Sequence, residues 1–195
     1  MKMSWLGYVA SSLASLLNMS QVPFAFSGKA TTALPYLNTL CVCVLWLAYA
    51  IDHKDLFIYV PNAFGIMSGL ICIIGTNNIV WWHSCILLVA FFLFYISDQI
   101  PNVYQYILIV AGICLFIAPV YDIVECWKRR VVIQTSWLFV VVSIVNTAVW
   151  IAYGVYHRLW TVWLSNAIGL TLITIQTIVI LIYNLMIRKR YVEMC

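Results

Sequence analysis

Apolar residues run in long stretches along this chain, and short polar clusters separate the stretches. A transmembrane helix needs about 20 mainly apolar residues to cross the hydrocarbon core of a bilayer. The pattern predicts seven such helices, over residues 5–27, 34–51, 56–76, 80–97, 103–127, 134–156 and 159–187. The first is the weakest, because several serines, Asn18 and Gln21 interrupt it. We interpret it as a helix and not as a cleaved signal peptide, since its polar residues continue into Pro23 without a small-residue cleavage site.

The composition excludes a soluble protein. Of the 195 residues, 65% are hydrophobic and only 8% are charged, against about 25% charged residues in ordinary soluble domains. Soluble enzymes and nucleic-acid-binding proteins are thereby excluded. We expect no enzyme activity, because no Ser/His/Asp or paired-carboxylate arrangement lies at mid-depth in the spans. We also expect no metal or cofactor, since Cys41 and Cys43 lack the neighbouring histidine or carboxylate that would complete a zinc site.

Positive charges give the expected orientation. With the N-terminus outside, the loops after the first, third and fifth spans and the C-terminal tail face the cytoplasm. These segments hold seven of the ten basic residues, namely Lys29, Lys128, Arg129, Arg130, Arg188, Lys189 and Arg190. Because cytoplasmic loops are enriched in Lys and Arg, we predict a multi-pass protein of the plasma membrane or an endomembrane, with its N-terminus outside and its C-terminus in the cytoplasm.

The sequence matches itself at an offset of 104 residues. Seven identities fall within twenty positions, and they pair Trp, Tyr, His, Asn and Gly and not only common aliphatic residues. The matched segments are 46–50 with 150–154, 53–54 with 157–158, and 61–65 with 165–169. The expected fold class is an all-α membrane protein in which a linker helix joins two parallel three-helix bundles (3+1+3). Its parts are a first repeat over 1–78, the linker helix over 79–101, a second repeat over 102–187 and a short cytoplasmic tail over 188–195.

This arrangement resembles the SWEET family of sugar transporters, in its eukaryotic seven-helix form, over nearly the whole chain. The segments that carry the resemblance are Ser20-Gln21-Val22-Pro23, Leu34-Pro35-Tyr36, Leu45 to Tyr49, Lys54 to Ile58, Pro61 to Gly65, Ala118-Pro119, Val149 to Gly154 and Ser165 to Gly169. Two expected prolines are absent: Ser136 stands early in the sixth span, and Ser165 precedes Asn166. The resemblance implies a bidirectional facilitative sugar transporter that works by alternating access.

Two asparagines are the first candidates for binding a substrate. Asn62 and Asn166 occupy equivalent depths in the two repeats, so we expect them to face each other across the pseudo-two-fold axis. Amides both donate and accept hydrogen bonds, which suits sugar hydroxyls. Trp46 and Trp150 stand sixteen residues before these asparagines, where an indole could stack on the C–H face of a sugar ring. Each amide could instead bond a neighbouring helix, and each indole could simply pack.

These residues predict a small pocket for a neutral monosaccharide such as glucose, because two indoles narrow it. The resemblance adds Ser20 and Val22 to the predicted substrate contacts. It also implies hinges at Pro23, Pro35 and Pro119. By the same likeness, the gate residues would be Tyr49, Asp55 and Tyr153.

The spans also predict how transport is driven. No carboxylate, Lys or Arg lies at mid-depth in any of them, whereas ion-coupled carriers normally need such a group. We therefore predict uncoupled uniport. The chain could form a homo-oligomer, although two fused repeats can complete a pathway in one chain.

Two alternatives stay open. An amino-acid transporter of the PQ-loop type carries Pro-Gln at the kink of the first helix in each repeat, where this chain has Gln21-Val22-Pro23 and Ala118-Pro119-Val120. A membrane scaffold that keeps the fold but transports nothing would show no solute flux at all.

Overall fold

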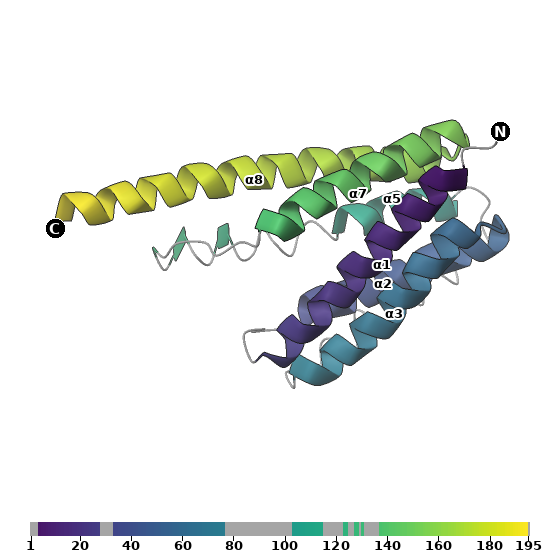
Figure 1. Cartoon of the computed structure of the whole chain (residues 1–195), viewed down its shortest axis with the longest axis horizontal. Helices are drawn as coiled ribbons and strands as arrows, with labels where there is room; N and C mark the ends of the chain where they lie inside the picture. The colour runs from purple at the N-terminus through teal and green to yellow at the C-terminus, as the bar shows by residue number, and fades with distance from the viewer. Residues whose placement is uncertain are drawn as a thin grey trace.

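The structure is a computed structural model that describes residues 4–27, 33–76, 103–114, 123–124, 127–128, 130 and 137–194. Its helices are α1 (Ser4–Phe26), α2 (Leu34–Asp52), α3 (Leu56–Thr76), α5 (Val103–Cys114), α7 (Trp137–Tyr156) and α8 (Trp160–Met194) (Figure 1). The predicted linker helix over 79–101 lies outside the described residues, as do Pro119 and Ser136. The all-helical fold is confirmed, and the complete 3+1+3 order stays a prediction.

The ends of the first three helices lie within one residue of the predicted ones, whereas the predicted end of the fifth span at 127 and start of the sixth at 134 adjoin residues outside the described part of the chain. α3 covers the predicted span 56–76, and α2 runs one residue past the predicted 34–51. α8 differs, because the predicted span ended at 187 with a separate tail, whereas the helix continues to Met194. No proline or glycine follows Gly169, so the sequence holds no signal that would stop the helix at the membrane surface.

Within the described residues, four segments are long and apolar enough to cross a membrane: Pro35–Asp52, Leu56–Thr76, Trp137–Tyr156 and Trp160–Ile187. In its described part α5 is apolar but shorter. α1 has 23 residues, but serines and amides lower its hydropathy. One face of α1 packs against α3 and α7; it buries Ser11 and lets Asn18 bond the carbonyl of Pro61 on α3, whereas Ser12 and Ser20 on other faces are exposed. Neighbouring helices thus accommodate polar groups that lipid would not.

The described helices form two groups with the same internal packing. α3 packs on both α1 and α2, and α8 packs on both α5 and α7. Between the groups, α1 packs against α7, and α2 packs against α5. The first helix of each repeat therefore lies against the second helix of the other, as a pseudo-two-fold axis requires. This pairing supports the duplication that the 104-residue offset predicts.

The turn between the second and third helices has the same backbone in both repeats. Lys54 has a φ of 51°, its N–H bonds the carbonyl of Ile51, and the N–H of Asp55 bonds the carbonyl of Ala50. Arg158 has a φ of 58°, its N–H bonds the carbonyl of Val155, and the N–H of Leu159 bonds the carbonyl of Gly154. This bond pair is a Schellman motif, which ends a helix with one residue in the left-handed region. The repeat is thus visible in backbone geometry as well as in sequence.

The buried residues form one shared cluster and two separate ones. The shared cluster joins both repeats near the two turns and contains Leu6, Ala10, Leu45, Tyr49, Ala50, Ile58, Leu108, Trp150, Tyr153 and Val162. The other clusters each lie within one repeat: Ala25, Tyr36, Leu37, Leu40, Cys72 and Ile73 in the first, and Ile123, Ile180, Tyr183 and Ile187 in the second. We call the end with turns 53–55 and 157–159 the turn end. At the opposite end, the divergent end, the two groups of helices spread apart (Figure 1).

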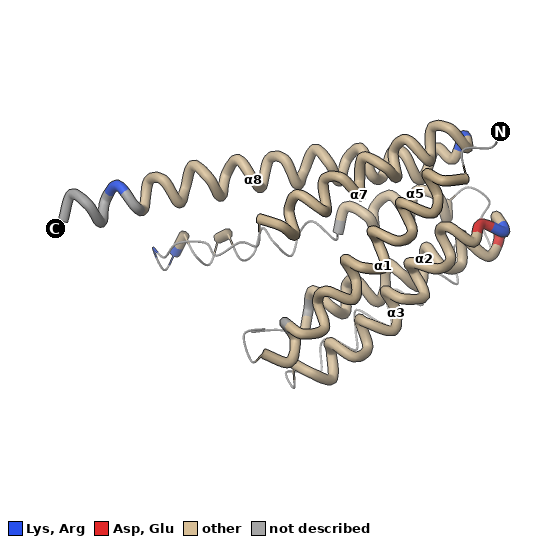
Figure 2. Tube along the Cα trace, in the orientation of Figure 1, with Lys and Arg blue, Asp and Glu red and all other residues tan. Residues whose placement is uncertain are grey.

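The described charged residues lie at the two ends, and the helices between them are uncharged (Figure 2). Lys54 and Arg158 belong to the turn end. At the divergent end, the ring of Trp127 stacks on Tyr183 of α8 with centroids 6.0 Å apart. This contact brings Lys128 to the same end of the molecule as Lys189. Lys128 and Lys189, one from each of the two predicted basic segments, thus share one end, which agrees with the even number of spans predicted between them.

Candidate functional site

A cavity of about 230 Å³ lies between the two repeats. Its lining residues are Ala14, Asn18, Thr39, Val42, Cys43, Trp46, Ile58, Pro61, Asn62, Trp150, Val162 and Asn166. The structure therefore brings the four residues singled out from sequence, both asparagines and both tryptophans, to the wall of one cavity. α1, α2 and α3 supply one side, and α7 and α8 supply the other.

The two predicted asparagines are held in the same way. Asn62 Nδ2 donates to the carbonyl of Ile58 at 2.7 Å, and Asn166 Nδ2 donates to the carbonyl of Val162 at 2.8 Å. Each bond reaches back one turn on its own helix and limits the side-chain rotamers. Because an amide has two N–H donors and an acceptor oxygen, each Asn has one donor and its Oδ1 without a hydrogen-bond partner in the described part of the chain, so these groups can meet a ligand. The predicted alternative, in which the amides only bond another helix, does not describe these contacts.

The tryptophans are also supported in matching ways. Trp46 packs edge-on against Tyr49 with ring centroids 5.4 Å apart, and Trp150 packs edge-on against Tyr153 at the same distance. Trp150 is 8% exposed, whereas Trp46 is half-buried. Each indole is therefore held by a tyrosine three residues later on the same helix, toward the turn end.

The predicted gate residues meet across the repeats. Tyr153 Oη donates a hydrogen bond of 2.6 Å to Asp55 Oδ2. Asp55 Oδ1 accepts from the backbone N–H groups of Phe57 at 2.9 Å and Ile58 at 3.3 Å, so the same carboxylate caps the N-terminus of α3. The Tyr49 and Tyr153 side chains are almost fully buried, at 2% exposure each. Asp55 thus ties the start of α3 to α7 at the turn end.

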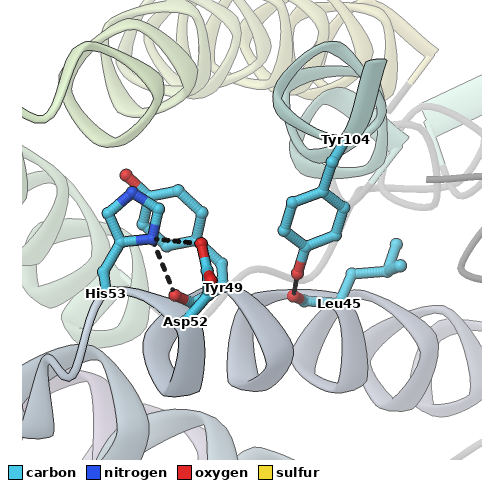
Figure 3. Close-up of polar contacts among 5 residues, drawn as sticks. All are labelled: Leu45, Tyr49, Asp52, His53 and Tyr104. Carbon is cyan, nitrogen blue, oxygen red and sulfur yellow. Dashed lines mark hydrogen bonds and ion pairs between the residues drawn. The ribbon is translucent and has the colours of Figure 1, made fainter. Parts of the chain in front are cut away.

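A second link between the repeats was not foreseen. Tyr104 of α5 donates a hydrogen bond to the backbone carbonyl of Leu45 on α2, one residue before Trp46 (Figure 3). Close by, the His53 ring stacks on Tyr49 with centroids 3.9 Å apart, and its Nδ1 lies 3.4 Å from an Asp52 carboxylate oxygen. Tyr104 lies outside the 104-residue match, so the sequence offered no repeat signal for it.

Two residues that the resemblance added do not line this cavity. Ser20 is exposed and donates to the carbonyl of Leu17 at 2.7 Å. Val22 packs against the separate core of the first repeat. Asn18 and Thr39 line the cavity instead, and the sequence analysis had noted Asn18 only as a polar interruption of the first span. The signal that could have found Asn18 is the one used for Asn62, an amide inside an apolar helix.

The predicted hinges take different positions in their helices. Pro23 lies inside α1, whereas Pro35 stands in the first turn of α2, where its missing N–H removes no helical hydrogen bond. Pro61 is a further interior proline, in α3, and it lines the cavity. Among the described residues, no three His, Cys, Asp or Glu side chains group as a metal site, and Cys41, Cys43 and Cys72 are free thiols.

Comparison with known proteins agrees with the fold. The chain matches the profile of a family described as "Sugar efflux transporter for intercellular exchange" over residues 6–76 and 103–188. It is also similar to a solved eukaryotic SWEET transporter, with a TM-score of 0.69 and 17% identity over 92% of this chain and 97% of that one. No curated protein sequence matches it. Since the family profile covers most of its length, the chain belongs to the SWEET family of sugar efflux transporters.

Proposed function

We propose that this protein is an uncoupled uniporter that carries a monosaccharide such as glucose in both directions by alternating access. The observation that carries the proposal is the cavity between the repeats, which is lined by both asparagines and both tryptophans: Asn62, Asn166, Trp46 and Trp150. Amides can bond sugar hydroxyls, and indole faces can cover the apolar C–H face of the ring. A mostly apolar pocket with a few converging polar groups is the usual form of a small-ligand site.

The size of the cavity favours a monosaccharide. Its volume of about 230 Å³ falls below the range of about 300–1,000 Å³ that drug-sized ligands occupy. Two indoles also reduce its width. A disaccharide would have to displace one of them, and Trp150 is held between its helix neighbours with little exposure.

The lining residues support uncoupled transport. Among the described residues that line the cavity there is no Asp, Glu, Lys, Arg or His side chain, and carriers driven by protons or sodium place such groups on the pathway. A neutral solute would therefore move down its own gradient, in either direction.

Alternating access would use the features at the two ends. The repeats meet at the turn end through the Asp55–Tyr153 hydrogen bond, and they diverge at the end that holds Lys128 and Lys189. With basic residues in the cytoplasm, the turn end would face outside, and this arrangement of the helices would be a conformation closed to that side. Pro23 and Pro119 would act as hinges, with Pro35 fixing the start of α2.

Counterflow tests this function directly. Proteoliposomes loaded with unlabelled glucose should accumulate labelled glucose with saturation, and a pH gradient should not change the rate. Asn62→Ala and Asn166→Ala should abolish the accumulation, because each removes an amide from the cavity. Thr171→Ala, an exposed position on the same helix as Asn166, is the matched control and should behave as wild type.

The open alternatives predict other results. An amino-acid carrier would show counterflow with amino acids and none with sugars. A scaffold would show no flux with either class. A strong dependence on the pH gradient would contradict uniport, and full activity in both asparagine variants would place the substrate elsewhere.

A further inference from the structure

A third amide reaches the cavity from α1. Asn18 lines the same space as Asn62 and Asn166, and its Nδ2 donates to the carbonyl of Pro61 at 3.0 Å. Pro61 directly precedes Asn62, so the bond fixes Asn18 beside the first of the paired asparagines. The two repeats therefore contribute unequally, with two amides from the first repeat and one from the second.

The packing around Asn18 leaves room for its side chain. Gly65 of α3 faces it, and a Cβ at Gly65 would lie 2.9 Å from Asn18 Nδ2 and would overlap the Sγ of Cys43. The absence of a side chain at Gly65 thus leaves the space that the Asn18 amide and Cys43 occupy. Because the Nδ2 is held by the Pro61 carbonyl, the orientation of the whole amide is set before any ligand arrives.

We propose that Asn18 contacts the sugar and determines its orientation. In the described part of the chain its Oδ1 accepts no hydrogen bond, so it can accept one from a sugar hydroxyl. Asn62 and Asn166 are related by the pseudo-two-fold axis and could hold a ring in either of two orientations. Asn18 removes that equivalence, because only one orientation presents a hydroxyl to it. This inference rests on the proposed function of the cavity.

The test is competition by glucose analogues that each lack one hydroxyl. In glucose counterflow with wild-type protein, one analogue should compete about 3- to 10-fold more weakly than glucose because it cannot bond Asn18. In Asn18→Ala that difference in competition should disappear. Glucose should compete only as strongly as this analogue, and the analogue itself should compete as it does with wild-type protein. Asn18→Leu, which keeps the number and branching of the side-chain heavy atoms, should give the same result if the Ala variant folds poorly.

The controls separate the possible failures. Ser12→Ala, an exposed position on the same helix, should keep the wild-type pattern. If both Asn18 variants weaken all sugars by the same factor, or change none of them, Asn18 only joins α1 to α3 and the inference is wrong. If the Asn18 variants fail in this way but Asn62→Ala is inactive, only the inference about Asn18 is wrong, and the proposed function of the cavity still holds. Wild-type transport in both Asn62→Ala and Asn166→Ala would instead remove the sugar site itself.

Discussion

The hydrogen bond between Tyr153 and Asp55 should set how often the turn end opens. Tyr153→Phe removes the hydroxyl and keeps the ring, which packs against Trp150 and against Phe57 of α3 at a centroid distance of 6.1 Å. A hydrogen bond to a charged group contributes about 1.5–3 kcal/mol. Asp55 is only half-buried, so we take about 1.5 kcal/mol, which corresponds to an increase of about tenfold in the ratio of open to closed molecules.

Distances between the two turns report this equilibrium. Spin labels at Lys54 and Arg158, one in each turn and both exposed, can be attached through cysteine in a chain whose native cysteines are replaced. Wild type should give mainly a short distance, and Tyr153→Phe should enlarge a second, longer population. The variant is cleaner than a change at Asp55, since Asp55 also caps α3 and its loss would add about 1 kcal/mol of helix destabilisation.

Tyr59→Phe provides the control, because Tyr59 is an exposed tyrosine of α3. It should leave the distance distribution as in wild type. The reasoning is refuted if Tyr153→Phe also leaves the distribution unchanged while the protein stays folded. In that case the buried residues around Tyr153 hold the turn end closed, and the hydrogen bond adds nothing measurable.

Three further changes test packing and backbone geometry. Gly65→Ala should lower stability by about 1–3 kcal/mol, measured by thermal unfolding in detergent, because the new methyl group overlaps Cys43; unchanged stability would show that α2 and α3 can move apart freely. Lys54→Gly should have a higher melting temperature than Lys54→Ala, because Lys54 has a φ of 51° and a residue with a Cβ in the left-handed region costs roughly 1–2 kcal/mol. Equal melting temperatures would contradict this reasoning. Asn146→Val should raise the free energy of unfolding by about 1 kcal/mol, because Asn146 Oδ1 is buried with no hydrogen-bond partner among the described residues. A lower free energy of unfolding would show that Asn146 has a partner.

The sequence predicted the elements well where polar clusters interrupt strongly apolar helices. α3 has the predicted ends, and the two turns around Lys54 and Arg158 match because the repeat preserves the residues that form them. Four of the residues that line the cavity were also singled out from the sequence: Trp46, Asn62, Trp150 and Asn166. A repeat places equivalent residues at equivalent depth, so an amide present in both copies points to the axis between them.

The face of α1 could not be read from the sequence. Residues 14 and 18 line the cavity, and at about 100° per residue Ser20 lies on nearly the opposite side of the helix. Val22 shares the face of Asn18 but lies about 6 Å further along the axis, within the separate core of the first repeat. Serines and amides occur on several sides of α1, so hydropathy gives no clear direction. The helix is oriented by its contacts with α3 and α7, which are distant in sequence.

The cavity rests directly on the core that joins the repeats, because Ile58, Trp150 and Val162 belong to both. A solute bound there, as proposed, would therefore touch the residues that close the turn end. Opening that end would then reshape the surface on which the solute lies, so that occupancy and access would be thermodynamically linked without a separate relay. Selectivity can then act on motion as well as on affinity: a solute that binds but fits this surface poorly will slow the carrier instead of passing through it.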